Sequence, residues 1–75
     1  MPKTNVDKVA ADYRRFNDFI RGELKRKNLH QRDLARYLND EESTLSRKLK
    51  GNRKWGLMEA LKAIEFLGAD LKEIL

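Results

Sequence analysis

The sequence predicts an all-α fold, arranged as a compact bundle of five helices. Apolar residues recur at spacings of three and four, which places them on one face of a helix, and Asn or Gly residues interrupt this pattern at intervals. The 75 residues contain no repeats or low-complexity segments. We therefore expect residues 1–75 to form a single domain, close to the smallest size at which a hydrophobic core suffices alone.

The first predicted helix begins near Asn5 and continues to about Lys27. Thr4 and Asp7 resemble a capping box, with Asp in place of the usual Glu. The apolar stripe that follows consists of Val6, Val9, Tyr13, Phe16, Ile20 and Leu24. This pattern fits one long helix, or two helices joined near Gly22.

Asn28 marks the end of this helix, because Asn tolerates the left-handed backbone conformation of a helix cap. Leu29 can then fold back onto the helix. The cations Lys25, Arg26 and Lys27 suit the negative end of a helix dipole. His30 is interpreted as a cap of the next helix or as a surface residue.

Two short helices are predicted in the stretch QRDLARYLNDEESTLSRKLKG, residues 31–51. Leu34 and Leu38 share one face of the first, and Leu45 and Leu49 share one face of the second. Between them, the Asn of the Asn-Asp pair at 39–40 can adopt the left-handed conformation of a sharp turn. This arrangement predicts a helix-turn-helix motif at residues 31–50.

Two further helices are predicted after the motif. Gly56 is the expected N-cap of a helix from Leu57 to about Leu67, and Gly68 is its expected end. The inner stripe of this helix is Leu57, Leu61, Ile64 and Leu67. A short last helix then begins at Asp70 and offers the apolar residues Leu71, Ile74 and Leu75.

The composition excludes several classes of protein. The absence of Cys excludes disulfides and thiolate metal sites, and a single His leaves few other metal ligands, so we expect no metal. With no apolar run of about 20 residues and no secretion signal, we expect a cytoplasmic protein without membrane contact. Without a Gly-rich phosphate loop or a clear carboxylate cluster, we expect neither an enzyme nor a cofactor or small-molecule ligand.

The positive charge is concentrated in one segment. The formal net charge is +5, and residues 43–54 contain five cations without any acid, so the remaining residues sum to zero. These five cations are Arg47, Lys48, Lys50, Arg53 and Lys54. Their position on the second motif helix and the loop after it favours a polyanionic partner over a merely solvated charged face.

The second motif helix points polar residues outward when Leu45 and Leu49 face the core. Small hydroxyl side chains beside long cations suit the major groove of DNA, where donors reach base edges without bulk between them. The alternative is a solvated helix face that only carries charge. We interpret as base-contacting the residues Ser43, Thr44, Ser46, Arg47 and Lys50.

The loop after Gly51 is predicted to contact DNA phosphates through Asn52, Arg53 and Lys54. Trp55 in this loop could lie along a DNA backbone, but we favour a ring that covers the core, because a small core gains much from burying it. The cations at 25–27 could also touch phosphate, although their place in a last helical turn already explains them.

The motif resembles that of the lambda repressor/Cro-like, or XRE-type, helix-turn-helix family. The resemblance covers about Phe16 to Leu75, and the matching positions are Gln31-x-x-Leu34-Ala35, Asn39, Ser43-Thr44-Leu45-Ser46-Arg47 and Gly51. It implies a lambda repressor-like fold, with Gln31 on a DNA phosphate and the outward residues of the second helix on bases.

Three departures from the family pattern concern charge and the turn. Asn39 replaces the usual turn Gly, Asp40 occupies a usually apolar position, and Lys48 stands where a core residue is common. We expect Leu49 to take over the burial that Lys48 cannot provide. The acids at positions 40–42 suit the helix dipole but oppose nearby phosphates.

These observations predict a sequence-specific double-stranded DNA-binding transcriptional regulator, a small Cro-like or phage-type repressor. It would bind a palindromic operator as a homodimer, through the last predicted helix or through Val6, Val9 and Tyr13. The alternative is a protein-interaction module, such as an antitoxin or an adaptor, that uses the helix-turn-helix surface. The acids Asp40, Glu41 and Glu42 favour this alternative, and the acid-free cation run opposes it.

Overall fold

The computed structural model describes residues 6–70 and 72, with the backbone alone for residues 6–11. These residues form four α-helices and no strand: α1 (Val6–Arg26), α2 (Gln31–Tyr37), α3 (Glu42–Leu49) and α4 (Leu57–Leu67). The all-α prediction is confirmed for this part of the chain. Outside the described residues lie Thr4 of the predicted capping box and Leu71, Ile74 and Leu75 of the predicted fifth helix.

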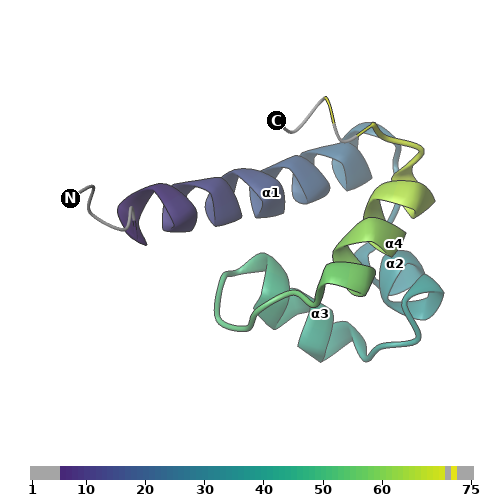
Figure 1. The fold of residues 1–75 in the computed structure, drawn as a ribbon. Coiled ribbons are helices and arrows are strands. Elements are labelled where there is room, and N and C mark those ends of the chain that lie inside the picture. The colour runs from purple at the N-terminus through teal and green to yellow at the C-terminus, as the bar shows by residue number, and fades with distance from the viewer. Residues whose placement is uncertain (1–5, 71, 73–75) are drawn as a thin grey trace.

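Helix α1 is one continuous helix of 21 residues, so of the two predicted alternatives the structure has the single long helix and not two helices joined near Gly22. Figure 1 shows it as a long rod with the three shorter helices gathered on one side. Its stripe turns toward them, with Ile20 and Leu24 buried and Tyr13 and Phe16 half-buried. The side chains of Val6 and Val9 lie outside the described residues.

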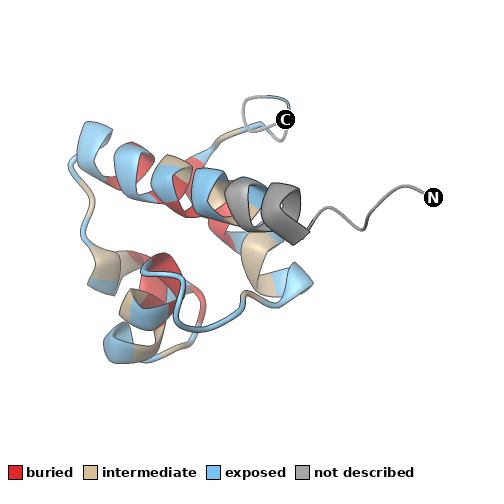
Figure 2. Cartoon of the chain, turned by 90° about the vertical axis from the view of Figure 1, so that its left-hand side faces the viewer, coloured by how far each residue is buried: buried red, intermediate tan, exposed pale blue. Residues whose placement is uncertain are grey.

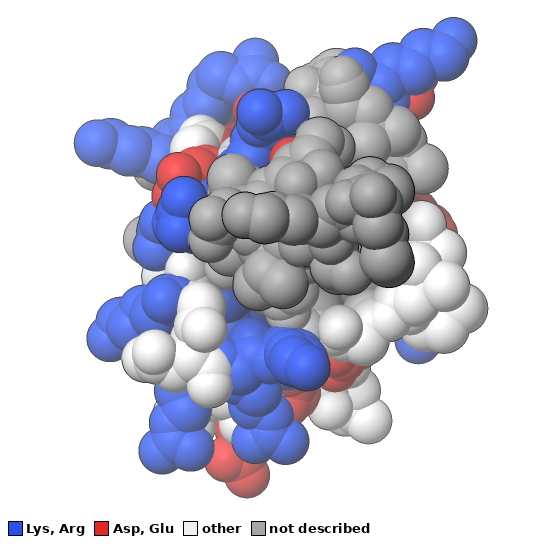
Figure 3. Space-filling model, turned by 60° about the vertical axis from the view of Figure 1, so that its left-hand side comes forward, with Lys and Arg blue, Asp and Glu red and all other residues white. Residues whose placement is uncertain are grey.

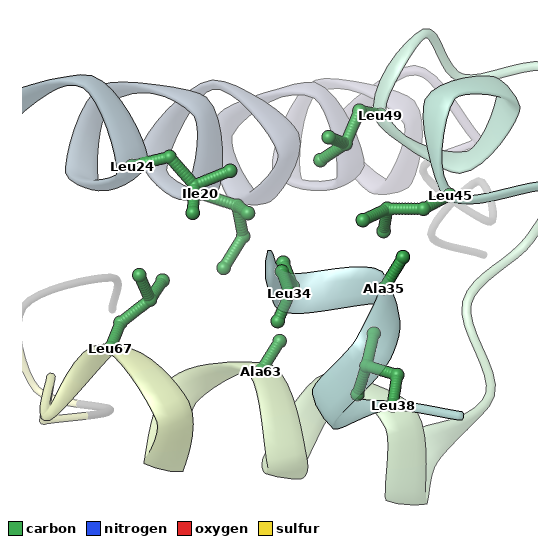
Figure 4. Close-up of a cluster of buried hydrophobic side chains, with 9 residues drawn as sticks. All are labelled: Ile20, Leu24, Leu34, Ala35, Leu38, Leu45, Leu49, Ala63 and Leu67. Carbon is green, nitrogen blue, oxygen red and sulfur yellow. The ribbon is translucent and has the colours of Figure 1, made fainter. Parts of the chain in front are cut away.

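The hydrophobic core lies between α1 and the other three helices (Figure 2). Figure 4 shows its nine buried residues, Ile20, Leu24, Leu34, Ala35, Leu38, Leu45, Leu49, Ala63 and Leu67. Every helix contributes to this cluster. The inward positions predicted for the two motif helices, at Leu34, Leu38, Leu45 and Leu49, are confirmed.

The predicted left-handed residues end the helices or turn the chain. Asn28 has a φ of 57° and Asn39 a φ of 56°, as the sharp turns require. After Asn28, the backbone N–H of Leu29 donates to the carbonyl of Leu24 at 2.7 Å, so Leu29 folds back as predicted. Gly68, with φ of 64°, ends α4.

The predicted inner stripe of α4 is wrong in its first half. Leu57 is 75 % exposed and Leu61 is 39 % exposed, together with Met58 at 65 %. The buried face instead follows Ala63, Ile64 and Leu67. Trp55 reaches the core from the preceding loop, so the first turn of α4 is not needed to cover it.

Candidate nucleic-acid interface

The outward face of α3 carries the polar residues predicted to contact bases. Leu45 and Leu49 are fully buried, which fixes the rotation of the helix. Ser43, Arg47 and Lys50 are consequently exposed. Thr44 and Ser46 are half-buried at the flanks of this row.

The loop after α3 leaves the helix through a left-handed turn. Gly51 has a φ of 84°, a conformation that Gly adopts without strain, and the N–H of Asn52 donates to the carbonyl of Arg47 at 2.9 Å. The side chains of Asn52, Arg53 and Lys54 are all exposed. The residues predicted to contact phosphate in this loop thus follow directly after the outward row of α3.

Four of the five cations in residues 43–54 are exposed: Arg47, Lys50, Arg53 and Lys54. We call these four residues the basic surface. Figure 3 shows Lys and Arg side chains gathered in the lower part of the face it presents, the level at which Figure 1 places α3. Because residues 43–54 contain no Asp or Glu, no acid of this segment opposes an approaching polyanion.

Gln31, predicted to contact a phosphate, is the first residue of α2 and is half-buried. His30 is the N-cap of this helix, and its backbone N–H donates to the carboxylate of Asp33 at 3.0 Å. The side chain of His30 is exposed, so its predicted role as a cap or surface residue is confirmed. Gln31 therefore lies at the start of the helix that packs against α3.

Lys48, the fifth cation, is buried, and the expectation that Leu49 alone would be buried here is wrong. Its side chain is 4 % exposed. Its Nζ lies 2.9 Å from Oδ2 of Asp40 and 2.6 Å from Oε2 of Glu59. A buried ammonium is tolerated only when it is paired and hydrogen-bonded, and two carboxylates meet that condition here.

The ion pairs change the pKa values of all three groups. The hydrogen bond from Lys48 lowers the pKa of Asp40 and that of Glu59, with smaller contributions from their backbone hydrogen bonds. For Lys48, burial acts to lower its pKa, but the hydrogen bonds to Glu59 and Asp40 together outweigh burial and raise it. All three groups therefore stay charged at neutral pH.

Trp55 covers the core, as predicted, and is half-buried. Its ring packs edge-on against Phe16 with ring centroids 5.3 Å apart, and its Nε1 donates to Oδ1 of Asn17 at 2.8 Å. Its backbone N–H donates to the hydroxyl of Tyr13. Lys48 lies over the same ring, with Nζ 5.8 Å from the centroid. These contacts fix the loop that carries part of the basic surface.

Arg21 also positions α3, which the sequence did not indicate. Its Nη1 donates to the carbonyl of Leu49 at 3.0 Å and so satisfies one of the last carbonyls of α3. The two residues are 28 positions apart, and no local spacing pattern reports such a contact. The charges at Asp40 and Lys48 did carry a signal, because they are opposite and stand at two positions that are usually apolar in the family that the motif resembles.

The cations at the end of α1 have structural partners. Arg26 donates to the buried carboxylate of Glu23 through Nε at 2.6 Å and Nη2 at 2.8 Å. Lys27 donates to the carbonyl of Leu67 at the end of α4. Lys25 is exposed. Lys25 and Arg26 lie in the last turn of α1, as predicted, whereas the contacts of Arg26 with Glu23 and of Lys27 with α4 are not part of the helix-dipole interpretation.

The remaining observations concern other classes of site. Among the described residues, no group of three or more His, Cys, Asp or Glu side chains is placed to hold a metal ion. None of the described helices combines the length and the apolar character that a membrane span requires. In comparisons with protein families, curated proteins and solved structures, nothing matches this chain.

Proposed function

We propose that the protein is a sequence-specific double-stranded DNA-binding transcriptional regulator, a small repressor of the lambda repressor/Cro-like type. The observation that carries this proposal is the outward row of α3, where Ser43, Arg47 and Lys50 are exposed together. Two buried leucines hold this row in a fixed orientation. Short hydroxyls and long cations on one short helix suit the major groove.

In the proposed complex, α3 enters the major groove and the basic loop meets the DNA backbone. Arg47 lies in the middle of the outward row, and its planar guanidinium can donate two hydrogen bonds to one guanine edge. Arg53 and Lys54 follow in the loop and act on phosphates. Gln31 at the start of α2 adds a phosphate contact from the neighbouring helix.

The alternative, a protein-interaction module, has less support from the acids before α3. Asp40 is held by Lys48 and is no longer available to a partner. Glu41 and Glu42 are exposed, and they suit the positive end of the helix dipole without any partner. The basic surface, which comes from a segment without Asp or Glu, favours a nucleic acid.

The proposal includes a two-fold homodimer on DNA, with α4 at its interface. Leu57, Met58 and Leu61 are exposed on α4. Beside Leu57 lies a groove of about 450 Å³ whose lining includes Tyr13 and Phe16. Exposed apolar side chains on α4 and a mostly apolar groove that Leu57 helps to line suit a self-complementary contact with a second copy.

This dimer is tested by sedimentation of the DNA complex. The unaltered protein is expected to place two chains on each palindromic site, whereas Leu57→Glu places one chain and binds more weakly, because it puts a charge into the contact. Leu57 is largely exposed, so this change leaves folding intact. One chain of the unaltered protein per specific site would rule out the dimer.

Selection from a random-sequence DNA pool at physiological salt tests the function itself. We expect enrichment of one palindromic site with half-site centres about 34 Å apart, one helical turn. Loss of enrichment in a variant with Arg47→Ala identifies the reading helix. A pool that stays unenriched with the unaltered protein contradicts the proposal.

A further inference from the structure

One buried ammonium connects the starts of two helices beside the basic surface. In each carboxylate that pairs with Lys48, the second oxygen accepts a backbone N–H. Oδ1 of Asp40 accepts from Glu41 at 3.0 Å, before α3, and Oε1 of Glu59 accepts from Gly56 at 2.9 Å, before α4. Lys48 thus orients two groups that in turn orient the first residues of α3 and α4.

Asp40 lies close to the surface that the proposed function assigns to DNA. It is separated from the first residue of α3 by a single residue. Without its cation, this carboxylate would place a negative charge near phosphates that approach α3. Repulsion between these like charges would weaken any complex with DNA.

We propose that Lys48 is a positioning residue for DNA binding: its buried ammonium neutralises Asp40 next to α3 and links α3, through Glu59, to the first turn of α4. This inference rests on the proposed function and adds a role for a residue that does not touch DNA. Lys48 reaches neither base nor phosphate, because its side chain is almost wholly buried. It acts through the two carboxylates and through Trp55.

The test compares four variants with the unaltered protein on one duplex that carries the selected site. They are Lys48→Met, Asp40→Asn, the double variant of both, and Lys72→Met. Met retains the length of the lysine stem without its charge. Lys72 is an exposed lysine that follows α4 in the sequence and lies outside residues 43–54, so it controls for the loss of one charge. Fluorescence anisotropy is measured at a temperature at which circular dichroism shows every variant to be folded.

We expect Lys48→Met to raise the Kd about tenfold, the effect of a like-charge contact of moderate strength, and Lys72→Met to raise it about twofold. Asp40→Asn binds at least as tightly as the unaltered protein, because it removes an acid. The double variant returns to within about threefold of Asp40→Asn, since no unpaired carboxylate is left at position 40. This rescue is the readout that a purely structural role of Lys48 would not produce.

A second measurement tests the positioning without DNA. In Lys48→Met, amide hydrogen exchange is expected to become faster at Glu41 and Gly56, whose N–H groups donate to the two carboxylates. Exchange unchanged at both amides overturns the proposal, and so does a double variant that binds as weakly as Lys48→Met. If the unaltered protein binds no duplex at all, the proposed function fails instead, and the role of Lys48 in DNA binding fails with it.

Discussion

The two faces of α3 place similar charges in opposite environments. Arg47 and Lys48 are neighbours in the sequence, yet Arg47 is exposed and Lys48 is 4 % exposed. The outward cation can meet a partner, whereas the inward cation is neutralised by Asp40 and Glu59. The number of cations in residues 43–54 is therefore larger by one than the number in the basic surface. The rotation of α3 decides which of these cations are exposed to a partner.

The largest effect is expected from a substitution on the inward face of α3. Leu45→Ala removes a fully buried side chain and is expected to lower the free energy of unfolding by about 3 kcal/mol. Leu57→Ala is the matched control, because this leucine is 75 % exposed and its loss is expected to change stability by about 0.5 kcal/mol or less. Urea denaturation measures both. Equal losses in the two variants would contradict the assignment of core and surface.

The pH dependence of stability probes the same inward face. Asp40 and Glu59 have lowered pKa values, so their stabilisation is present above their ordinary values of 3.8 and 4.5 and is lost as the pH falls through the lowered ones. Lys48 has a raised pKa, so its stabilisation is present below 10.5 and is lost as the pH rises through the raised value. We expect the stabilisation from these three groups to be constant between these limits and to decline on both sides.

Lys48→Met is expected to weaken the acid decline and to remove the part of the alkaline decline that comes from this ammonium. At neutral pH we expect it to cost about 1 to 2 kcal/mol of stability, because both carboxylates retain some access to water. The hydrogen bond from Tyr37 to Glu65 raises the pKa of Tyr37, so this group also titrates in the alkaline range. The variant Tyr37→Phe lacks this group and so shows how much of the alkaline decline comes from it. Urea denaturation across a pH series measures the free energy of unfolding. If this free energy depends on pH identically in Lys48→Met and in the unaltered protein, the ion pairs do not stabilise the fold.

On the outward face, Arg47→Ala is expected to leave stability almost unchanged and to weaken binding. The expected loss of binding free energy is about 1 to 3 kcal/mol on the preferred site and much less on random DNA, because a base contact is lost. Lys54→Ala is the control, since a lost phosphate contact weakens all DNA alike. Anisotropy with both duplexes measures each variant. Equal weakening of the two duplexes by Arg47→Ala would make Arg47 a phosphate contact and shift the reading face elsewhere.

Local patterns predicted most of the fold. The spacing of Leu34, Leu38, Leu45 and Leu49 located both motif helices, and Asn28 and Asn39 located their turns, because these signals act within a few residues. The first turn of α4 was not predictable in this way. Its apolar residues have helical spacing, but Trp55 already covers the adjoining core, so burial depended on packing between distant segments.

In the candidate site, too, local patterns predicted some features and packing between distant segments determined others. The outward direction of Ser43, Arg47 and Lys50 followed from the helical period once the leucines were placed inward. The burial of Lys48 did not follow from the helical period. It depends on the turn before α3, α3 itself and α4 bringing Asp40, Lys48 and Glu59 together. The contact of Arg21 with the end of α3 depends likewise on tertiary structure.

The salt dependence of binding tests the central claim most directly. The unaltered protein is titrated onto its selected duplex across a series of salt concentrations, and log K is plotted against log salt. Two phosphate-contacting cations, Arg53 and Lys54, predict a slope of about −2 for each protomer, because each neutralised phosphate contributes about −0.9. Removing one of them in Lys54→Ala should reduce this slope by about one. A flat response, or no binding at low salt, would contradict a basic surface that binds DNA.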